Sequence, residues 1–265
     1  MSLIPTDERL RPLDTVFNLR DFGGYAGADG RAVVTGRLFR SAHLAKVSEA
    51  EAAVLDGLQL DYVADFRHAP ERVKQPSVWS GGAVVLTQPA GDETLEVAPH
   101  EAFVREHMHS PEDARGYMMR SYAKRLSDPS FIALHRAALE GMTAQGQGDM
   151  PPGILVHCAA GKDRTGTFVA LVQKLLGVSE DDVMADYLLT REAVDIEAIL
   201  EPAAAMYSKR HGRPFTADTL RPMFGVDADY LDAAFAPIGP VEAYATDVLG
   251  LSEAQLDTLR ARYLG

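Results

Sequence analysis

The only cysteine of this 265-residue chain lies in residues 155–168, LVHCAAGKDRTGTF. Small residues follow Cys158, and they allow a backbone to curl closely around an anion. Arg164 comes six positions later, and its planar guanidinium can hold two oxygens of one phosphoryl group. Cys158 and Arg164 therefore have the types and the spacing of a thiolate nucleophile and an oxyanion-binding group.

The elements around this segment are expected to support that chemistry. An apolar strand over 154–157 and a helix over 165–178 place the loop at a strand–helix junction. The N-terminus of a helix presents free N–H groups and partial positive charge, which favour a phosphate and a thiolate. We therefore expect Thr165 to donate a hydrogen bond to the sulfur. The other expected phosphate-binding residues are those of the loop, Ala159, Ala160, Gly161 and Lys162.

Three motifs carry a resemblance to a known family. Residues 157–166, HCAAGKDRTG, match the signature His-Cys-x5-Arg-Ser/Thr, and the chain resembles the cysteine-dependent phosphatases. With NLRDFGGY at 18–25 and DFRHAPE at 65–71, it is similar to bacterial tyrosine and lipid phosphatases of the mycobacterial phosphatase B type. The resemblance extends from about residue 13 to about residue 190, with a similar helix at the C-terminus.

The resemblance implies a role for each matching residue. Cys158 would attack phosphorus and form a cysteinyl-phosphate, while Arg164 and the loop amides stabilise the equatorial oxygens. His157 would support the loop through hydrogen bonds. Two acids compete for the role of general acid: Asp163 inside the loop, and Asp65, which begins the second motif. Either carboxylate could instead only pair with a neighbouring arginine. The resemblance implies neither a metal nor a cofactor.

Lys162 bears on the substrate that the resemblance implies. A basic loop residue neutralises additional ring phosphates, so it favours a broad enzyme that acts on phosphotyrosine proteins and phosphoinositides, although Lys162 could also only face solvent. The expected partners are such a phosphorylated substrate and phosphate. Two alternatives are a phosphate-binding module on an inactive phosphatase fold and a cysteine sulfurtransferase. Retention of both Cys158 and Arg164 favours the hydrolase.

Composition excludes several other classes of protein. The formal charge of −12 disfavours nucleic acid and anionic membranes as partners. No apolar run of membrane-spanning length occurs, so we expect no stable membrane insertion. One cysteine permits no intrachain disulfide, and no signal peptide is recognisable; a cytoplasmic location is expected, with export by another route left open. His100, His107 and His109 lack the spacing of a metal site.

The pattern of elements predicts an α/β fold: a central, mainly parallel sheet flanked by helices, as in cysteine phosphatases, with an inserted helical lid. We expect one domain over 1–265 and a cover or insertion around 87–126. Asp29-Gly30 indicates a turn in an antiparallel pair, and Ser48 with Glu51 forms a capping box that begins a helix. Because of its prolines and glycines, the region 201–226 is the one least expected to form ordered structure. The other predicted elements are strands at 60–67 and 81–86 and helices at 112–126, 129–142 and 179–200.

Overall fold

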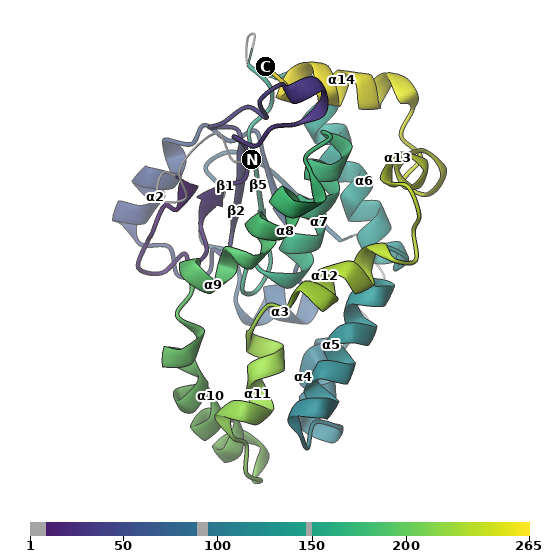
Figure 1. Cartoon of the computed structure of the whole chain (residues 1–265). Helices are drawn as coiled ribbons and strands as arrows, with labels where there is room; N and C mark the ends of the chain where they lie inside the picture. The colour runs from purple at the N-terminus through teal and green to yellow at the C-terminus, as the bar shows by residue number, and fades with distance from the viewer. Residues whose placement is uncertain (1–8, 89–94, 147–149) are drawn as a thin grey trace.

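A single five-stranded sheet forms the centre of the molecule. The computed structural model describes residues 9–88, 95–146 and 150–265 (Figure 1). The strands are β1 (Arg20–Asp21), β2 (Leu38–Ser41), β3 (Tyr62–Asp65), β4 (Val84–Thr87) and β5 (Ile154–His157). Their order is β1-β2-β5-β3-β4; β1 is antiparallel to β2 and the other neighbours are parallel. The predicted α/β class and mainly parallel sheet are confirmed.

Helices bury both faces of the sheet at its centre, whereas the edge strand β4 stays largely exposed. Along β5, Leu155 packs with Leu55 of α2 (Glu49–Asp56), whereas Ile154 and Val156 belong to the larger apolar cluster on the other face. This alternation is expected because successive side chains of a strand point to opposite faces. Helices α6 (Pro129–Thr143) and α7 (Asp163–Leu175) contribute to that larger cluster. The capping box of Ser48 and Glu51 forms at the start of α2 as predicted.

The N-terminal antiparallel pair also forms. Arg20 of β1 lies opposite Arg40 of β2, and between the strands the chain turns back through a short 3-10 helix, Ala28–Gly30. Asp29 has a positive φ of 58° there, a conformation that Asp tolerates better than most residues. The remaining helices are α3 (Ala69–Lys74), α4 (Pro99–Glu106), α5 (Pro111–Arg125), α8 (Glu180–Leu188), α9 (Thr190–Ala193), α10 (Ile196–His211), α11 (Ala217–Phe224), α12 (Ala228–Phe235), α13 (Val241–Ala243), a π-helical turn (Tyr244–Val248) and α14 (Glu253–Tyr263).

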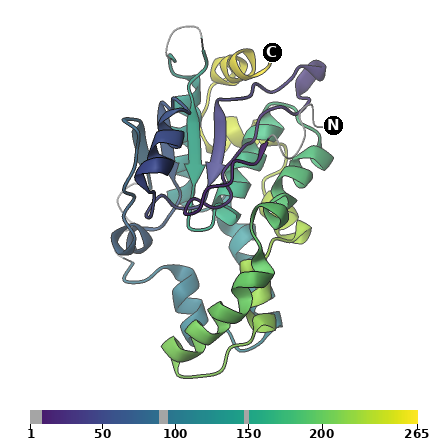
Figure 2. The same ribbon diagram turned by 90° about the vertical axis from the view of Figure 1, so that its left-hand side faces the viewer.

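A separate group of helices projects beyond one end of the sheet. Helices α4, α10, α11 and the adjoining part of α5 form this lobe, which we call the cover (Figure 1, Figure 2). The cover has its own buried apolar cluster, made by Phe103, Val104, Met108, Ala114, Leu200, Ala203, Ala204, Phe215 and Leu220. Of the region predicted as an insertion, 89–94 lies outside the described residues, and α4 and α5 occupy most of the rest.

The expectation of weak order over 201–226 is wrong. Pro202 lies in the first two turns of α10 and Pro222 lies within α11, so both helices accommodate a proline. Gly212 ends α10 in the left-handed conformation, with a φ of 65°, which glycine adopts without strain. Buried Leu220 supplies the apolar contact that fixes α11 in the cover. Here the two prolines lie within helices, and Gly212 marks the end of a helix.

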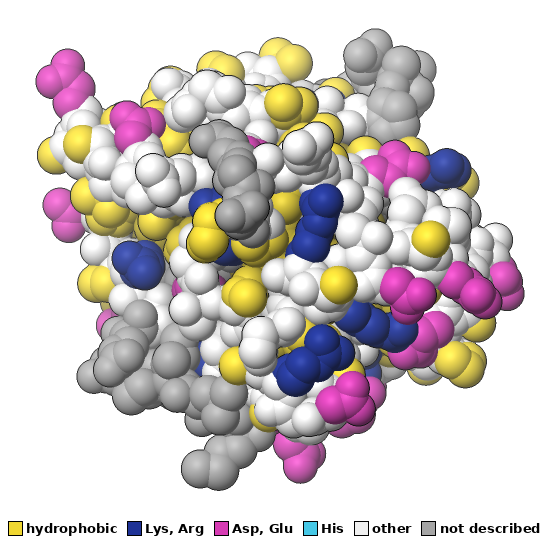
Figure 3. All heavy atoms as spheres, turned by 90° about the horizontal axis from the view of Figure 1, so that it is seen from above, with side chains coloured by type: hydrophobic (Ala, Val, Ile, Leu, Met, Phe, Trp, Pro, Cys, Tyr) yellow, Lys and Arg dark blue, Asp and Glu magenta, His cyan; other side chains and the backbone are white. Residues whose placement is uncertain are grey.

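The end of the molecule opposite the cover has mixed surface chemistry. Figure 3 shows acidic and basic side chains interspersed with apolar ones on this face. Among the described residues, no helix has both the length and the hydropathy needed to cross a membrane.

Candidate active site

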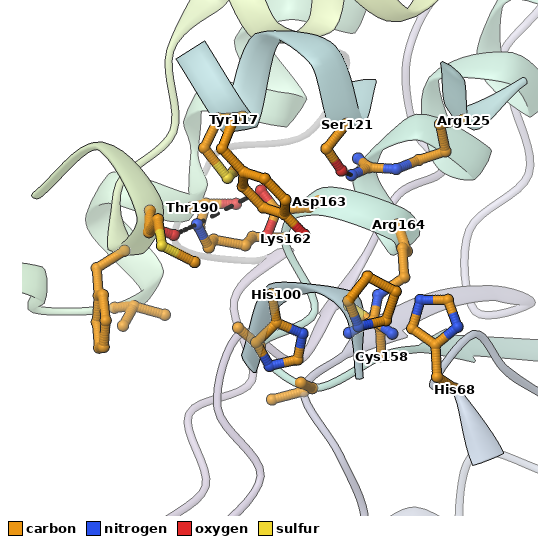
Figure 4. Close-up of a pocket in the computed structure, with 18 of the residues that line it drawn as sticks. His68, His100, Tyr117, Ser121, Arg125, Cys158, Lys162, Asp163, Arg164 and Thr190 are labelled. Atoms are coloured by element: carbon orange, nitrogen blue, oxygen red, sulfur yellow. Dashed lines mark hydrogen bonds and ion pairs between the residues drawn. The ribbon is translucent and has the colours of Figure 1, made fainter. Parts of the chain in front are cut away.

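A cavity of about 570 Å³ lies where the loop after β5 meets the cover (Figure 4). Cys158, Asp163 and Arg164 line it from the loop side. Helix α5 forms one wall, and α10 and α11 contribute apolar side chains opposite. The position agrees with the general placement of ligands beyond the carboxyl ends of parallel strands.

The backbone of the loop is held in one conformation from behind. Gly161 has a φ of 65°, and a Cβ at this position would lie 2.2 Å from the carbonyl oxygen of Ser41. The Gly161 carbonyl accepts hydrogen bonds from Asn18 Nδ2 and from an Arg40 guanidinium nitrogen, each at 2.9 Å. The backbone N–H of His43 donates to the Ala159 carbonyl at 3.2 Å. Because the C=O and N–H of a peptide point in opposite directions, these bonds turn loop amides toward the cavity.

A buried network of charges supports those contacts. One guanidinium nitrogen of Arg40 lies 2.8 Å from Asp186 Oδ2, and Arg20 Nε lies 3.4 Å from Asp186 Oδ1. Arg20 also donates to Asn18 Oδ1, and all four side chains are buried or nearly so. Burial, followed by the charge of Arg40, lowers the pKa of Arg20 to about 10. Two arginines against one aspartate leave a net positive charge beneath the loop.

Arg164 is fixed by a carboxylate from the second motif. Both terminal guanidinium nitrogens bond Glu71, one of them to Oε1 at 2.8 Å, and one also donates to the Phe66 carbonyl at 3.1 Å. Burial alone would raise the pKa of Glu71, but the charge and hydrogen bonds of Arg164 outweigh it and lower the pKa to about 2. Burial likewise lowers the pKa of Arg164, and Glu71 more than reverses this. Arg164 Nε takes no part in these bonds.

Asp163 faces the cavity from a helix rather than a loop. Helix α7 begins at Asp163, two residues earlier than the sequence predicts, so Asp163 and Arg164 occupy its first turn. The Tyr122 hydroxyl of α5 donates to Asp163 Oδ1 at 2.6 Å and lies 2.8 Å from the Tyr187 hydroxyl. A pair of buried tyrosines therefore sets the orientation of this carboxylate.

Asp65 is not brought to the cavity. It ends β3, is 3% exposed, and accepts hydrogen bonds from Arg67 Nε at 2.9 Å and from a terminal nitrogen at 2.6 Å. Burial would raise its pKa, but the charge of His157 and the hydrogen bonds of Arg67 outweigh it, so the pKa is lowered. A carboxylate bonded in this way remains ionised and is a poor proton donor.

The remaining predicted residues lie in or near the loop. His157 is fully buried, burial lowers its pKa, and its Nδ1 lies 3.8 Å from Asp65 Oδ1. Neither ring nitrogen has a hydrogen-bond partner among the described residues, so the hydrogen bonds expected from His157 to the loop are not formed. Thr165 is also buried, and within the described part of the chain its hydroxyl has no hydrogen-bond partner. The expected bond from Thr165 to the sulfur is therefore not formed here.

Lys162 connects the loop to the cover. Its ammonium donates to the Gly225 carbonyl at 2.7 Å and to the Met223 carbonyl, and it lies 3.4 Å from Asp163 Oδ1 (Figure 4). Burial lowers the pKa of Lys162. The side chain is buried rather than solvent-facing, and although it lines the cavity, its ammonium is engaged by α11 and the residues after it.

The sequence did not predict the role of several side chains in the site. Glu71 belongs to a motif whose spacing singled it out, but its pairing with Arg164 follows only from the fold. Asn18 begins the motif NLRDFGGY and Arg40 lies in the predicted antiparallel pair, yet their partners are more than 100 residues away. Tyr122, from the predicted insertion, gave no local signal. His100, which the sequence offered only as a metal ligand, lines the cavity at the start of α4. Within the described ranges, no group of three or more His, Cys, Asp or Glu could hold a metal ion.

Comparison with known proteins identifies the family. A model described as the tyrosine phosphatase family matches residues 11–265. A protein of Cupriavidus necator, whose name assigns it to the tyrosine-protein phosphatases, is 33% identical over 95% of this chain and 87% of its own length. The triple specificity protein phosphatase PtpB of Mycobacterium tuberculosis is 31% identical over 97% of this chain and 99% of its own length.

A comparison with a solved structure of TpbA from P. aeruginosa gives 18% identity and a TM-score of 0.26. It covers 86% of this chain and 97% of the TpbA chain. The family model covers nearly the whole chain, and both relatives are more than 30% identical to it over at least 95% of its length. The chain belongs to the tyrosine phosphatase family.

Proposed function

We propose that this protein hydrolyses phosphomonoesters through a phosphocysteine, acting on phosphotyrosine proteins and on phosphoinositides. One observation carries the proposal: Cys158 and Arg164 line the same cavity, and Glu71 holds the arginine by both terminal nitrogens. A thiolate and a guanidinium in this relation match the two demands of phosphoryl transfer, which are an in-line nucleophile and stabilisation of the equatorial oxygens.

The reaction has two steps. The Cys158 thiolate attacks phosphorus, the S–P bond forms, the bond from phosphorus to the ester oxygen breaks, and the leaving oxygen takes a proton from the acid. Water then attacks phosphorus, the S–P bond breaks, and the same residue accepts the water's proton as phosphate leaves. We assign the acid to Asp163, because it lines the cavity, whereas Asp65 is buried against Arg67. Arg164 and the amides of 159–162 would bind the transferring group.

Two observations support a broad substrate range. The relative from M. tuberculosis is named a triple specificity phosphatase. The cavity also extends well beyond the loop, from half-exposed Phe17 on one side to Tyr117 of α5 on another. The alternative of a binding module on an inactive fold has no supporting observation here, since both Cys158 and Arg164 are in place. A sulfurtransferase would not require an acid beside the nucleophile.

Phosphate release tests the proposal directly. Wild-type protein is assayed on phosphotyrosine, phosphoserine and phosphothreonine peptides and on phosphoinositides, with Cys158→Ser as the blank. We expect turnover by wild type and none above background by Cys158→Ser. Turnover by Cys158→Ser at the wild-type rate would contradict the mechanism.

A second measurement identifies the acid. Asp163→Asn is expected to remove the limb of the pH–rate profile that reports the acid, and Asp65→Asn is expected to retain that limb. The opposite result would transfer the role to Asp65.

A further inference from the structure

Helix α5 carries a buried cation, Arg125, that has no acidic partner in the described part of the chain. Arg125, in the last turn of the helix, is 6% exposed, and its guanidinium carbon lies 3.9 Å from the centre of the Tyr122 ring. It donates to Ser121 Oγ at 3.0 Å and to Thr167 Oγ1 at 3.3 Å. Among the described residues, no carboxylate forms an ion pair with it. Burial of a charge is costly unless an opposite charge compensates, so this guanidinium lacks the anion that its position calls for.

The position of Arg125 places that anion close to the catalytic loop. Arg125 lines the same cavity as Cys158 and lies on the same side as Arg164 (Figure 4). Its partner Thr167 is one turn after Asp163 in α7, and the Thr167 hydroxyl donates to the Asp163 carbonyl at 3.0 Å. The guanidinium is therefore at the depth of the loop and not at the mouth of the cavity.

Two more cations extend the same wall. Arg120 and Lys124, five residues and one residue before Arg125, also line the cavity. Both are exposed, and neither forms an ion pair with a described residue. The acids nearby are already engaged. Asp163 is bonded by Tyr122, and Asp128 accepts from the backbone N–H of Ser130 at 2.9 Å. Lys162 is the basic residue that the sequence favours for binding additional phosphates. Its ammonium already donates to the carbonyl of Met223 in α11 and to that of Gly225 just after the helix.

We propose that Arg125, Arg120 and Lys124 form a second anion subsite, which binds a further phosphate on the same small scaffold as the phosphate that is cleaved. The substrate class is a polyphosphorylated polyol, with phosphates on neighbouring ring carbons. A peptide fits less well. When the phosphate of a phosphotyrosine reaches the loop, the tyrosine ring keeps the flanking peptide residues near the mouth of the cavity, too far out to contact Arg125. The inference rests on the proposed function and deepens it.

The test compares matched substrates. Phosphate release is measured for a soluble inositol phosphate with two phosphates on adjacent carbons and for the corresponding monophosphate. We expect wild type to have a kcat/KM about tenfold higher for the bisphosphate, which corresponds to about 1.4 kcal/mol. The double variant Arg120→Ala/Lys124→Ala should lose most of that preference through KM, with kcat on the monophosphate unchanged within about twofold. Arg125→Met should abolish the preference, and Arg125→Lys should restore part of it.

Controls separate the subsite from other effects. Lys209→Ala removes an exposed charge from α10 outside the cavity and should keep the preference. Equal losses on both substrates would assign Arg125 a structural role and overturn the subsite, as would a wild type without preference. If Arg125→Met does not fold, the double variant Arg120→Ala/Lys124→Ala, at exposed positions, tests the subsite by its loss of the preference for the bisphosphate. A preference seen only with doubly phosphorylated peptides would overturn the polyol assignment, whereas no turnover of any substrate would contradict the proposed function itself.

Discussion

The floor of the cavity and its cover are built from opposite kinds of interaction. The floor is the loop after β5 together with the first turn of α7, residues 158–164. It is held by the buried charges of Arg20, Arg40 and Asp186 and by the ion pair of Glu71 with Arg164. The cover is held by a small apolar cluster that is separate from the main core. Charged hydrogen bonds require a particular geometry, whereas apolar packing of a peripheral lobe permits local opening. We infer that the floor fixes the reaction and that the cover determines what reaches it.

The largest effect is expected from Arg164→Lys, in the floor. A lysine ammonium is a point charge and cannot hold Glu71 and two phosphoryl oxygens at once. We expect kcat on a phosphotyrosine peptide to fall about 10³-fold, close to the cost of losing a principal oxyanion donor. The matched control, Arg136→Lys, changes an exposed arginine of α6 and should leave kcat within about twofold. A loss below tenfold in Arg164→Lys would show that the floor does not depend on the guanidinium.

Asp186→Asn tests the charges beneath the loop. The substitution leaves Arg20 and Arg40 buried without a counter-charge, which costs about 3 kcal/mol of the free energy of unfolding. Urea denaturation should therefore show a lower midpoint with an unchanged slope. Asp181→Asn, at an exposed position of the same helix, is the control and should change stability little. Equal stability of wild type and Asp186→Asn would show that the network is not part of what holds the floor.

The Glu71–Arg164 pair should have a distinct pH dependence. The folded-state pKa of Glu71 is about 2, against an ordinary value of 4.5. Because the folded-state pKa is the lower one, the stability from this pair is complete above pH 4.5 and is lost as the pH falls toward 2. The shift corresponds to at most about 3 kcal/mol. The difference in unfolding free energy between wild type and Glu71→Gln should shrink over that range, and a constant difference from pH 7 to pH 2.5 would contradict the assignment.

A pair of identical substitutions compares the two regions directly. Leu171 of α7 and Leu220 of α11 are both fully buried, one in the main core and one in the cover. Each Leu→Ala change removes about 2 to 3 kcal/mol of packing. Leu171→Ala should lower the global unfolding free energy by that amount. Leu220→Ala should mainly accelerate amide exchange in α10 and α11. Equal global losses would show that the cover unfolds together with the sheet.

The same comparison explains what the sequence revealed. Local patterns predicted the strand–loop–helix junction at Cys158 and the capping box at Ser48, because both depend on residues within a few positions. The pairing of Arg40 with Asp186 spans 146 residues, so no local pattern contains it. The prediction of weak order over 201–226, in the cover, was wrong for a different reason. Pro202, Gly212 and Pro222 carry the signals of a loop, and only the packing of Leu220 in the tertiary structure makes the segment helical.

The smallest effect is expected at Lys162, where floor and cover meet. Its ammonium bonds the carbonyls of Met223 and Gly225 at the end of α11. Lys162→Met keeps a long flexible side chain but removes these bonds, and the two carbonyls can turn to water, so the net cost is about 1 kcal/mol. Amide exchange over 217–224 should become about fivefold faster, while exchange in α7 stays unchanged. If the loop and α11 exchange as before, the cover is held by its apolar cluster alone, and Lys162 is free to act on the substrate as the resemblance implied.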